Sequence, residues 1–132
     1  MKALLLIFTA CLAYLNPVVS EQQAEQAYRE VQELLATKHD LLKARVVPRE
    51  LFNVFYVDAE QISCTRPEPD ADGCYIAYNN VSPDGHRSVT YVIKVAERCS
   101  DPMKTLKHEY CHAIMSFLED PRWETLCHAH YE

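Results

Sequence analysis

The sequence predicts an α+β fold with one long helix first, then a small, mostly antiparallel sheet of about three strands, then two more helices. Apolar residues recur at helical spacing from residue 21 to about residue 45. Three later segments are rich in β-branched and aromatic residues: 51–57, 74–79 and 88–95. Two Asp-Pro pairs then mark the starts of two helical segments. This order of elements is typical of one small α+β domain.

The first 20 residues have the pattern of a secretory signal peptide. Lys2 precedes an apolar run, Ala3 to Leu15, which is too short to cross a membrane. Val18-Val19-Ser20 fits a cleavage site. We therefore expect a signal peptide at residues 1–20 and a secreted or periplasmic domain at residues 21–132.

A lipoprotein anchor at Cys11 is the less favoured alternative, because Phe8 fits that signal poorly. Loss of Lys2 with the signal would change the formal net charge from −6 to −7. An acidic chain without a basic run has no electrostatic reason to bind nucleic acid or anionic lipid. We expect no nucleic-acid partner and no membrane span, and we expect a monomer that acts on a peptide or protein.

The first helix and the strands follow from hydrophobic periodicity. The apolar residues of the helix fall on one face: Ala24, Ala27, Tyr28, Val31, Leu34, Leu35, Leu41 and Leu42. Segment 51–57 carries apolar groups on both alternating sets, which predicts a strand covered on both faces. In segment 88–95, Val89, Tyr91, Ile93 and Val95 alternate with other residues and predict one buried strand face. Pro83-Asp84-Gly85 predicts a turn before that strand.

The helix that begins at Asp101-Pro102 carries the pattern H-E-x-x-H at residues 108–112. Two His residues four positions apart project from the same helix face, so His108 and His112 can bind one zinc ion. Glu109 can accept a proton from a water on that zinc. The apolar stripe of this helix faces elsewhere and consists of Leu106, Tyr110, Ala113, Ile114 and Phe117.

A catalytic zinc site needs a third protein ligand. The second Asp-Pro pair, Asp120-Pro121, predicts a last helix from Arg122 to about Tyr131 that runs antiparallel to the H-E-x-x-H helix. If the chain reverses near residue 120, His112 and His128 lie at the same height, eight residues on either side. His128 is therefore the first candidate for the third ligand.

Three other residues remain candidates for that position. Glu124 lies one turn from His128 on the same helix face. Glu132 would lie level with His108, but it is the last residue of the chain. His130 falls on the face that carries Trp123, Leu126 and Cys127, which favours a packed residue or a donor near the substrate.

Five cysteines follow the signal peptide: Cys64, Cys74, Cys99, Cys111 and Cys127. In an oxidising compartment most should be paired, and the odd number leaves one free. Cys64 and Cys74 bracket a Pro/Asp-rich loop and are the natural first pair. A Cys111–Cys127 bridge would tie the last two helices together, but Cys111 as a buried free thiol is an equal alternative.

The H-E-x-x-H motif and this order of elements resemble a small single-domain zincin metallopeptidase of the gluzincin-like kind. Identity at the level of motifs is confined to residues 108–112. The resemblance implies zinc at His108 and His112, Glu109 as general base, and a peptide that pairs with an edge strand. Met115 and Leu118 stand where the metzincin extension would have its Gly and third His.

We therefore expect a secreted zinc metalloendopeptidase that hydrolyses peptide bonds with zinc bound by His108, His112 and His128. Tyr131 and His130 are candidates to stabilise the oxyanion, because they follow the ligand helix. The alternative function is a zinc-stabilised or disulfide-stapled secreted binding or inhibitory protein without turnover. In that alternative, a fourth protein ligand such as Glu124 would close the zinc site.

Overall fold

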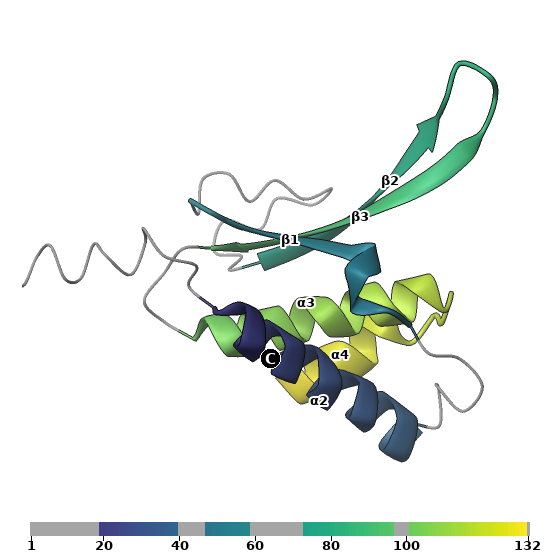
Figure 1. Cartoon of the computed structure of the whole chain (residues 1–132). Coiled ribbons are helices and arrows are strands. Elements are labelled where there is room, and N and C mark those ends of the chain that lie inside the picture. Colours follow the sequence, from purple (N-terminus) through teal and green to yellow (C-terminus); the bar gives the residue numbers. More distant parts are fainter. Residues whose placement is uncertain (1–18, 40–46, 59–72, 97–100, 132) are drawn as a thin grey trace, which may run out of the picture.

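The structure is a computed structural model that describes residues 19–39, 47–58, 73–96 and 101–131. Its elements are α2 (Glu21–His39), the short 3₁₀ helix η1 (Arg49–Leu51), β1 (Phe52–Val57), β2 (Gly73–Val81), β3 (Arg87–Ala96), α3 (Pro102–Phe117) and α4 (Trp123–Tyr131). The helices lie together on one face of the sheet, and α3 packs against α2, α4, β2 and β3 (Figure 1). The α+β class is therefore confirmed.

Several sequence-based expectations fall outside the described residues. These are most of the signal peptide, the end of the first predicted helix after His39, and Cys11, Cys64, Cys99 and Glu132. Within the described part of the chain, no helix is both long enough and apolar enough to cross a membrane.

The sheet is mixed, so the expectation of a mostly antiparallel sheet is wrong. The strand order is β1-β3-β2. Strands β2 and β3 form an antiparallel hairpin, whereas β1 pairs with β3 in parallel, with Phe52 opposite Tyr91 and Val57 opposite Ala96. The β2–β3 hairpin makes these two strands antiparallel. Strand β1 pairs with the other edge of β3 and runs in the same direction as β3.

The β2–β3 hairpin extends beyond the helical layer (Figure 1). Its tip is a turn in which Gly85 has a φ of 88°, a backbone conformation that favours glycine. Tyr78, Val81 and Val89 on the outer half of the hairpin are exposed, because the helices do not reach that far. Ile93 and Val95, nearer the helices, are fully buried, as their alternation predicts, whereas the same prediction is wrong for Val89.

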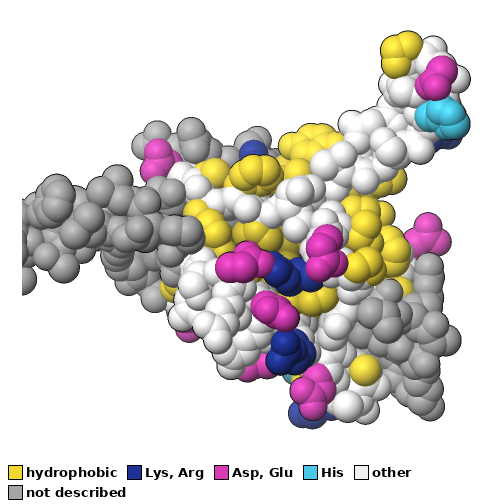
Figure 2. All heavy atoms as spheres, in the orientation of Figure 1, with side chains coloured by type: hydrophobic (Ala, Val, Ile, Leu, Met, Phe, Trp, Pro, Cys, Tyr) yellow, Lys and Arg dark blue, Asp and Glu magenta, His cyan; other side chains and the backbone are white. Residues whose placement is uncertain are grey.

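The hydrophobic core lies between the sheet and the helices. Its largest fully buried side chains are Leu35 from α2, Ile93 from β3, and Leu106, Tyr110, Ile114 and Met115 from α3. The ring of Tyr28 packs edge-on against Tyr110 with the centroids 5.0 Å apart. Its hydroxyl donates a hydrogen bond of 2.5 Å to the carbonyl of Val47 and so fixes α2 to the chain that enters β1. Figure 2 shows apolar side chains exposed over the sheet, whereas acidic and basic side chains lie next to one another over the helices.

Helix α3 begins and ends where the sequence predicts. Asp101 is its N-cap and accepts a hydrogen bond of 3.1 Å from the backbone N–H of Lys104, and Pro102 occupies the first helical position. Beyond its end, Glu119 has a φ of 57°, in the left-handed region. This residue breaks the helical path and lets α4 return along α3. The predicted helical hairpin is confirmed.

Candidate metal centre

Three histidine side chains meet between the last two helices. His108 and His112 come from successive turns of α3 and His128 comes from α4. Their ligand atoms all lie within 4.8 Å of one another, so the cluster could hold a metal ion. The ring centroids of His108 and His128 are 4.7 Å apart, and those of His112 and His128 are 5.2 Å apart. All three side chains are partly buried.

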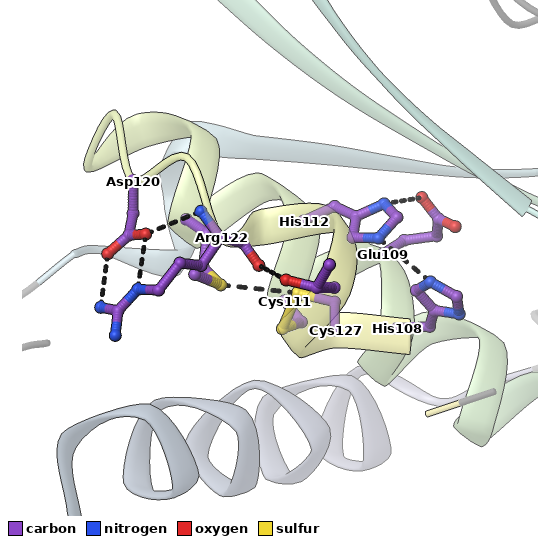
Figure 3. Close-up of a disulfide and its surroundings, with 9 residues drawn as sticks. His108, Glu109, Cys111, His112, Asp120, Arg122 and Cys127 are labelled. Carbon is purple, nitrogen blue, oxygen red and sulfur yellow. Dashed lines mark hydrogen bonds and ion pairs between the residues drawn. A yellow bond between two sulfur atoms is a disulfide. The ribbon is translucent and has the colours of Figure 1, made fainter. Parts of the chain in front are cut away.

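Two ligand nitrogens of the cluster already have a spacing close to that of zinc ligands. Nε2 of His108 lies 3.1 Å from Nε2 of His112. Two nitrogens that bind one tetrahedral zinc at about 2.05 Å each are about 3.3 Å apart. Figure 3 shows these two side chains projecting together from α3, beside Glu109. The three imidazoles and the spacing of this pair therefore fit a divalent metal ion such as zinc.

Among the candidates for the third ligand that lie in the described residues, the structure brings only His128 into this cluster, and Glu132 lies outside them. Glu124 and His130 are both exposed, and no fourth His, Cys, Asp or Glu of the described chain joins the three histidines. Two neighbouring antiparallel helices have the same rise per residue, so residues equidistant from the reversal face each other. The exposure of His130 also shows that the expectation of a packed side chain there is wrong.

His112 is held in the neutral form that binds metals. Burial, together with charge repulsion from the nearby His108 and His128, lowers its pKa to about 3. A histidine must be deprotonated at the nitrogen that ligates a metal. The cluster therefore presents at least one imidazole that is neutral throughout the physiological pH range.

Glu109 lies beside the cluster in a nearly dry environment. Its side chain is 6% exposed, and its Oε2 has no hydrogen-bond partner. That oxygen is 3.9 Å from Nδ1 of His112, which is too long for a hydrogen bond (Figure 3). Burial raises the pKa of Glu109 to about 8. In metal-free protein the carboxyl is thus largely protonated at pH 7, whereas a nearby dication would favour the carboxylate.

The start of β2 covers Glu109 at Gly73, a residue that the sequence did not single out. A Cβ on Gly73 would lie 2.7 Å from Cγ2 of Thr105 and 3.1 Å from Cγ of Glu109. Only glycine fits this approach between strand and helix without displacing one of these groups. No local sequence pattern could have revealed this requirement, because it arises where β2 passes close to α3.

The buried carboxyl makes the stability of the metal-free protein depend on pH. A group whose pKa is raised by folding stabilises the folded state below its unfolded pKa, near 4.5, and loses that effect as the pH rises through its folded pKa, about 8. We expect metal-free wild type to lose a few kcal/mol of unfolding free energy relative to metal-free Glu109→Gln between pH 5 and pH 8, because one pKa unit corresponds to about 1.4 kcal/mol.

Urea unfolding of both proteins in a chelator, at pH 5 and pH 8, measures this change. The comparison with Glu109→Gln cancels the titration of other groups that the two proteins share, such as His112. An equal difference at both pH values would contradict the prediction. Restoring the metal at pH 8 should remove the penalty in the wild type, because the dication stabilises the carboxylate.

A disulfide joins the two helices that carry the histidines. Cys111 and Cys127 are bonded, with their Cα atoms 5.8 Å apart, and both are fully buried (Figure 3). This pairing settles the open alternatives for Cys111, which is not a free thiol. Each cysteine precedes a histidine of the cluster, so the bridge fixes the distance between the backbones of His112 and His128. Cys74 is also disulfide-bonded, and its partner lies outside the described residues.

The two residues expected to stabilise an oxyanion, His130 and Tyr131, lie at the C-terminal end of α4. His130 is exposed, and Tyr131 is half-buried and packs against the hydrophobic core. The aromatic residue that does contact the cluster is Trp123. Its ring lies edge-on to His112, with the centroids 5.2 Å apart and the planes at 83°. Local sequence patterns could not predict this contact, because it depends on the path of the turn between α3 and α4.

Comparisons of the chain with protein-family models, with curated proteins and with solved structures found no match. The function of the cluster is therefore inferred from its own chemistry. Three imidazoles converge on one point, a buried carboxyl lies beside them, and a disulfide ties the two helices that carry them. Such a site can bind a divalent metal ion and hold or move a proton next to it.

Proposed function

We propose that the protein is a small zinc-dependent peptidase in which His108, His112 and His128 hold the metal. The observation that carries the proposal is the convergence of three imidazoles beside the buried carboxyl of Glu109, whose Oε2 has no hydrogen-bond partner. A buried polar atom without a partner is costly in a folded protein, and such atoms are concentrated at functional sites.

The choice of zinc follows from the donor set. Three imidazole ligands suit zinc as well as copper, nickel and iron. Catalytic zinc typically has three protein ligands and one open position, and no fourth side chain of the described chain closes this cluster. When bound, zinc would supply a Lewis acid that polarises the scissile carbonyl and makes water acidic near neutral pH.

The chain itself supplies the proton transfers. Glu109 accepts a proton from the attacking water and donates it to the amine that leaves. Glu109 is buried beside His112, so a dication held by the cluster would favour its carboxylate form, which can accept a proton. The partly buried histidines would hold the metal beside this carboxyl. The surrounding core limits the access of bulk water.

The proposal is tested by the metal content of the purified, oxidised protein, measured for wild type, His128→Ala and Glu124→Ala. We expect one zinc per chain in wild type and in Glu124→Ala, and an affinity at least about 100-fold lower in His128→Ala, because a direct ligand is lost. Glu124→Ala is the matched control, since Glu124 lies one turn away on the same helix and is exposed.

Two results would contradict the proposal, and each favours a different alternative. If properly oxidised wild type binds no zinc, the reading as a disulfide-stapled interaction domain is favoured. If the zinc is bound but resists small chelators and no peptide in a mixed library is cleaved, a metal-stabilised binding protein is favoured. Cleavage that requires zinc and is lost in His128→Ala supports the peptidase.

A further inference from the structure

Trp123 is the only tryptophan of the chain and lies at the edge of the histidine cluster. It is the first residue of α4. Its ring contacts His112 edge-on, as described above, yet 41% of the side chain remains exposed. One edge of the cluster is thus formed by a large apolar surface that the fold only partly covers.

The position of this surface distinguishes it from the other exposed apolar residues. Among the described residues, the other large hydrophobic side chains that are strongly exposed all lie on the sheet: Phe55, Tyr78, Val81 and Val89. Trp123 alone of this group lies on a helix and touches a histidine of the cluster. A tryptophan that served only to cover His112 would need no exposed face. Partly exposed aromatic residues beside polar sites are the usual anchors for ligand side chains.

We propose that Trp123 is a specificity-determining residue, and that its exposed ring binds a large apolar or aromatic side chain of the substrate next to the bond that is cut. The inference rests on the proposed function and deepens it by naming the substrate class. A substrate whose carbonyl lies at the histidine cluster places the side chain of a flanking residue beside His112, and therefore beside the indole. Aromatic rings pack well at centroid distances of about 4.5–7 Å, which this arrangement allows.

The test uses two hydroxamates that bind zinc in the same way and differ in one side chain: the hydroxamates of N-acetylphenylalanine and N-acetylalanine. We expect zinc-loaded wild type to bind the phenylalanine compound on the order of tenfold more tightly, as expected for packing against an aromatic ring. Trp123→Ala should lose this preference and bind the two compounds with similar affinities. Trp123→Phe, which keeps an aromatic ring, should retain most of it.

A preference that is absent in wild type, or that persists in Trp123→Ala, would overturn the inference. Zinc content is measured for each variant, so that loss of metal is not mistaken for loss of the side-chain contact. Wild type alone provides an independent readout, since all tryptophan emission comes from Trp123. The phenylalanine compound should shift this emission to shorter wavelength and the alanine compound should not. An unchanged emission with saturating phenylalanine compound would overturn the inference even if Trp123→Ala did not fold.

Matched peptides separate this inference from the proposed function. Zinc-loaded wild type should cleave a peptide with phenylalanine beside the scissile bond with a higher kcat/KM than the same peptide with alanine there. Equal cleavage of both peptides would defeat the inference about Trp123 and leave the peptidase standing. No cleavage of either peptide, with the hydroxamate preference intact, would defeat the peptidase and leave Trp123 as a binding surface.

Discussion

Glu109→Gln is expected to keep its zinc and to lose peptide hydrolysis by a factor of about 10² to 10⁴. The amide has almost the shape of the carboxyl, so packing beneath Gly73 should be preserved. It cannot accept a proton at neutral pH, and general acid–base catalysis typically contributes that factor. Zinc content and kcat for a cleaved peptide, measured on the same preparation, test both parts of the expectation.

Glu124→Gln is the control for this change, because it alters an exposed carboxylate of α4 in the same way. It should leave both zinc content and kcat unchanged. Turnover that persists in Glu109→Gln would show that Glu109 is not the general base. Loss of zinc from Glu109→Gln would assign it another role, since its Oε2 faces Nδ1 of His112 and a carboxylate in that position orients a ligand histidine.

The double variant Cys111→Ala/Cys127→Ala is expected to unfold more easily and to bind zinc more weakly. The bridge spans 16 residues, and closing a loop of that size contributes about 3 kcal/mol to stability. Helix α4 has only nine residues, too few to be stable in isolation. Without the bridge, His128 is held against α3 only by the turn and by packing, so metal binding must also order α4. Thermal unfolding without metal and a zinc titration measure the two effects.

Leu35→Ala serves as a matched control for general destabilisation. Leu35 is fully buried on α2, a helix that carries no histidine of the cluster, and a change of this kind costs about 2–5 kcal/mol. It should lower the unfolding temperature by a similar amount while leaving the zinc affinity of the folded protein unchanged. If the cysteine variant also kept wild-type zinc affinity, the bridge would be a stabilising element with no part in the site.

Local sequence patterns predicted most of the arrangement of α3 and α4. Asp101-Pro102 begins α3 as an N-cap and first helical residue, and the tight reversal near residue 120 places α4 antiparallel to it. The fixed rise of a helix then brings His128 level with His112. The three histidines of the candidate site were predictable for that reason, because each step depends on residues close in sequence.

Long-range relations could not be derived in this way. The direction of β1 relative to β3 depends on which edge of the hairpin it joins, and strand patterns are the same for either edge. The state of Cys111 stayed open, because the rotation of two helices about their axes is set by the whole core. Met115 is not part of the apolar stripe that the sequence predicts for α3, yet it is fully buried, and its sulfur lies 3.6 Å from Sγ of Cys127.

The central places of β3 and α3 have a consequence for the order in which the chain folds. In the described structure β1 and β2 both pair with β3, and α2 packs chiefly against α3. A growing chain that has reached residue 86 contains a helix and two strands but none of the surfaces that hold them in place. Such a topology is rich in contacts between distant residues, which slows folding. We therefore expect the last third of the chain to form the nucleus, and the first third to condense on it only after synthesis of the domain is complete.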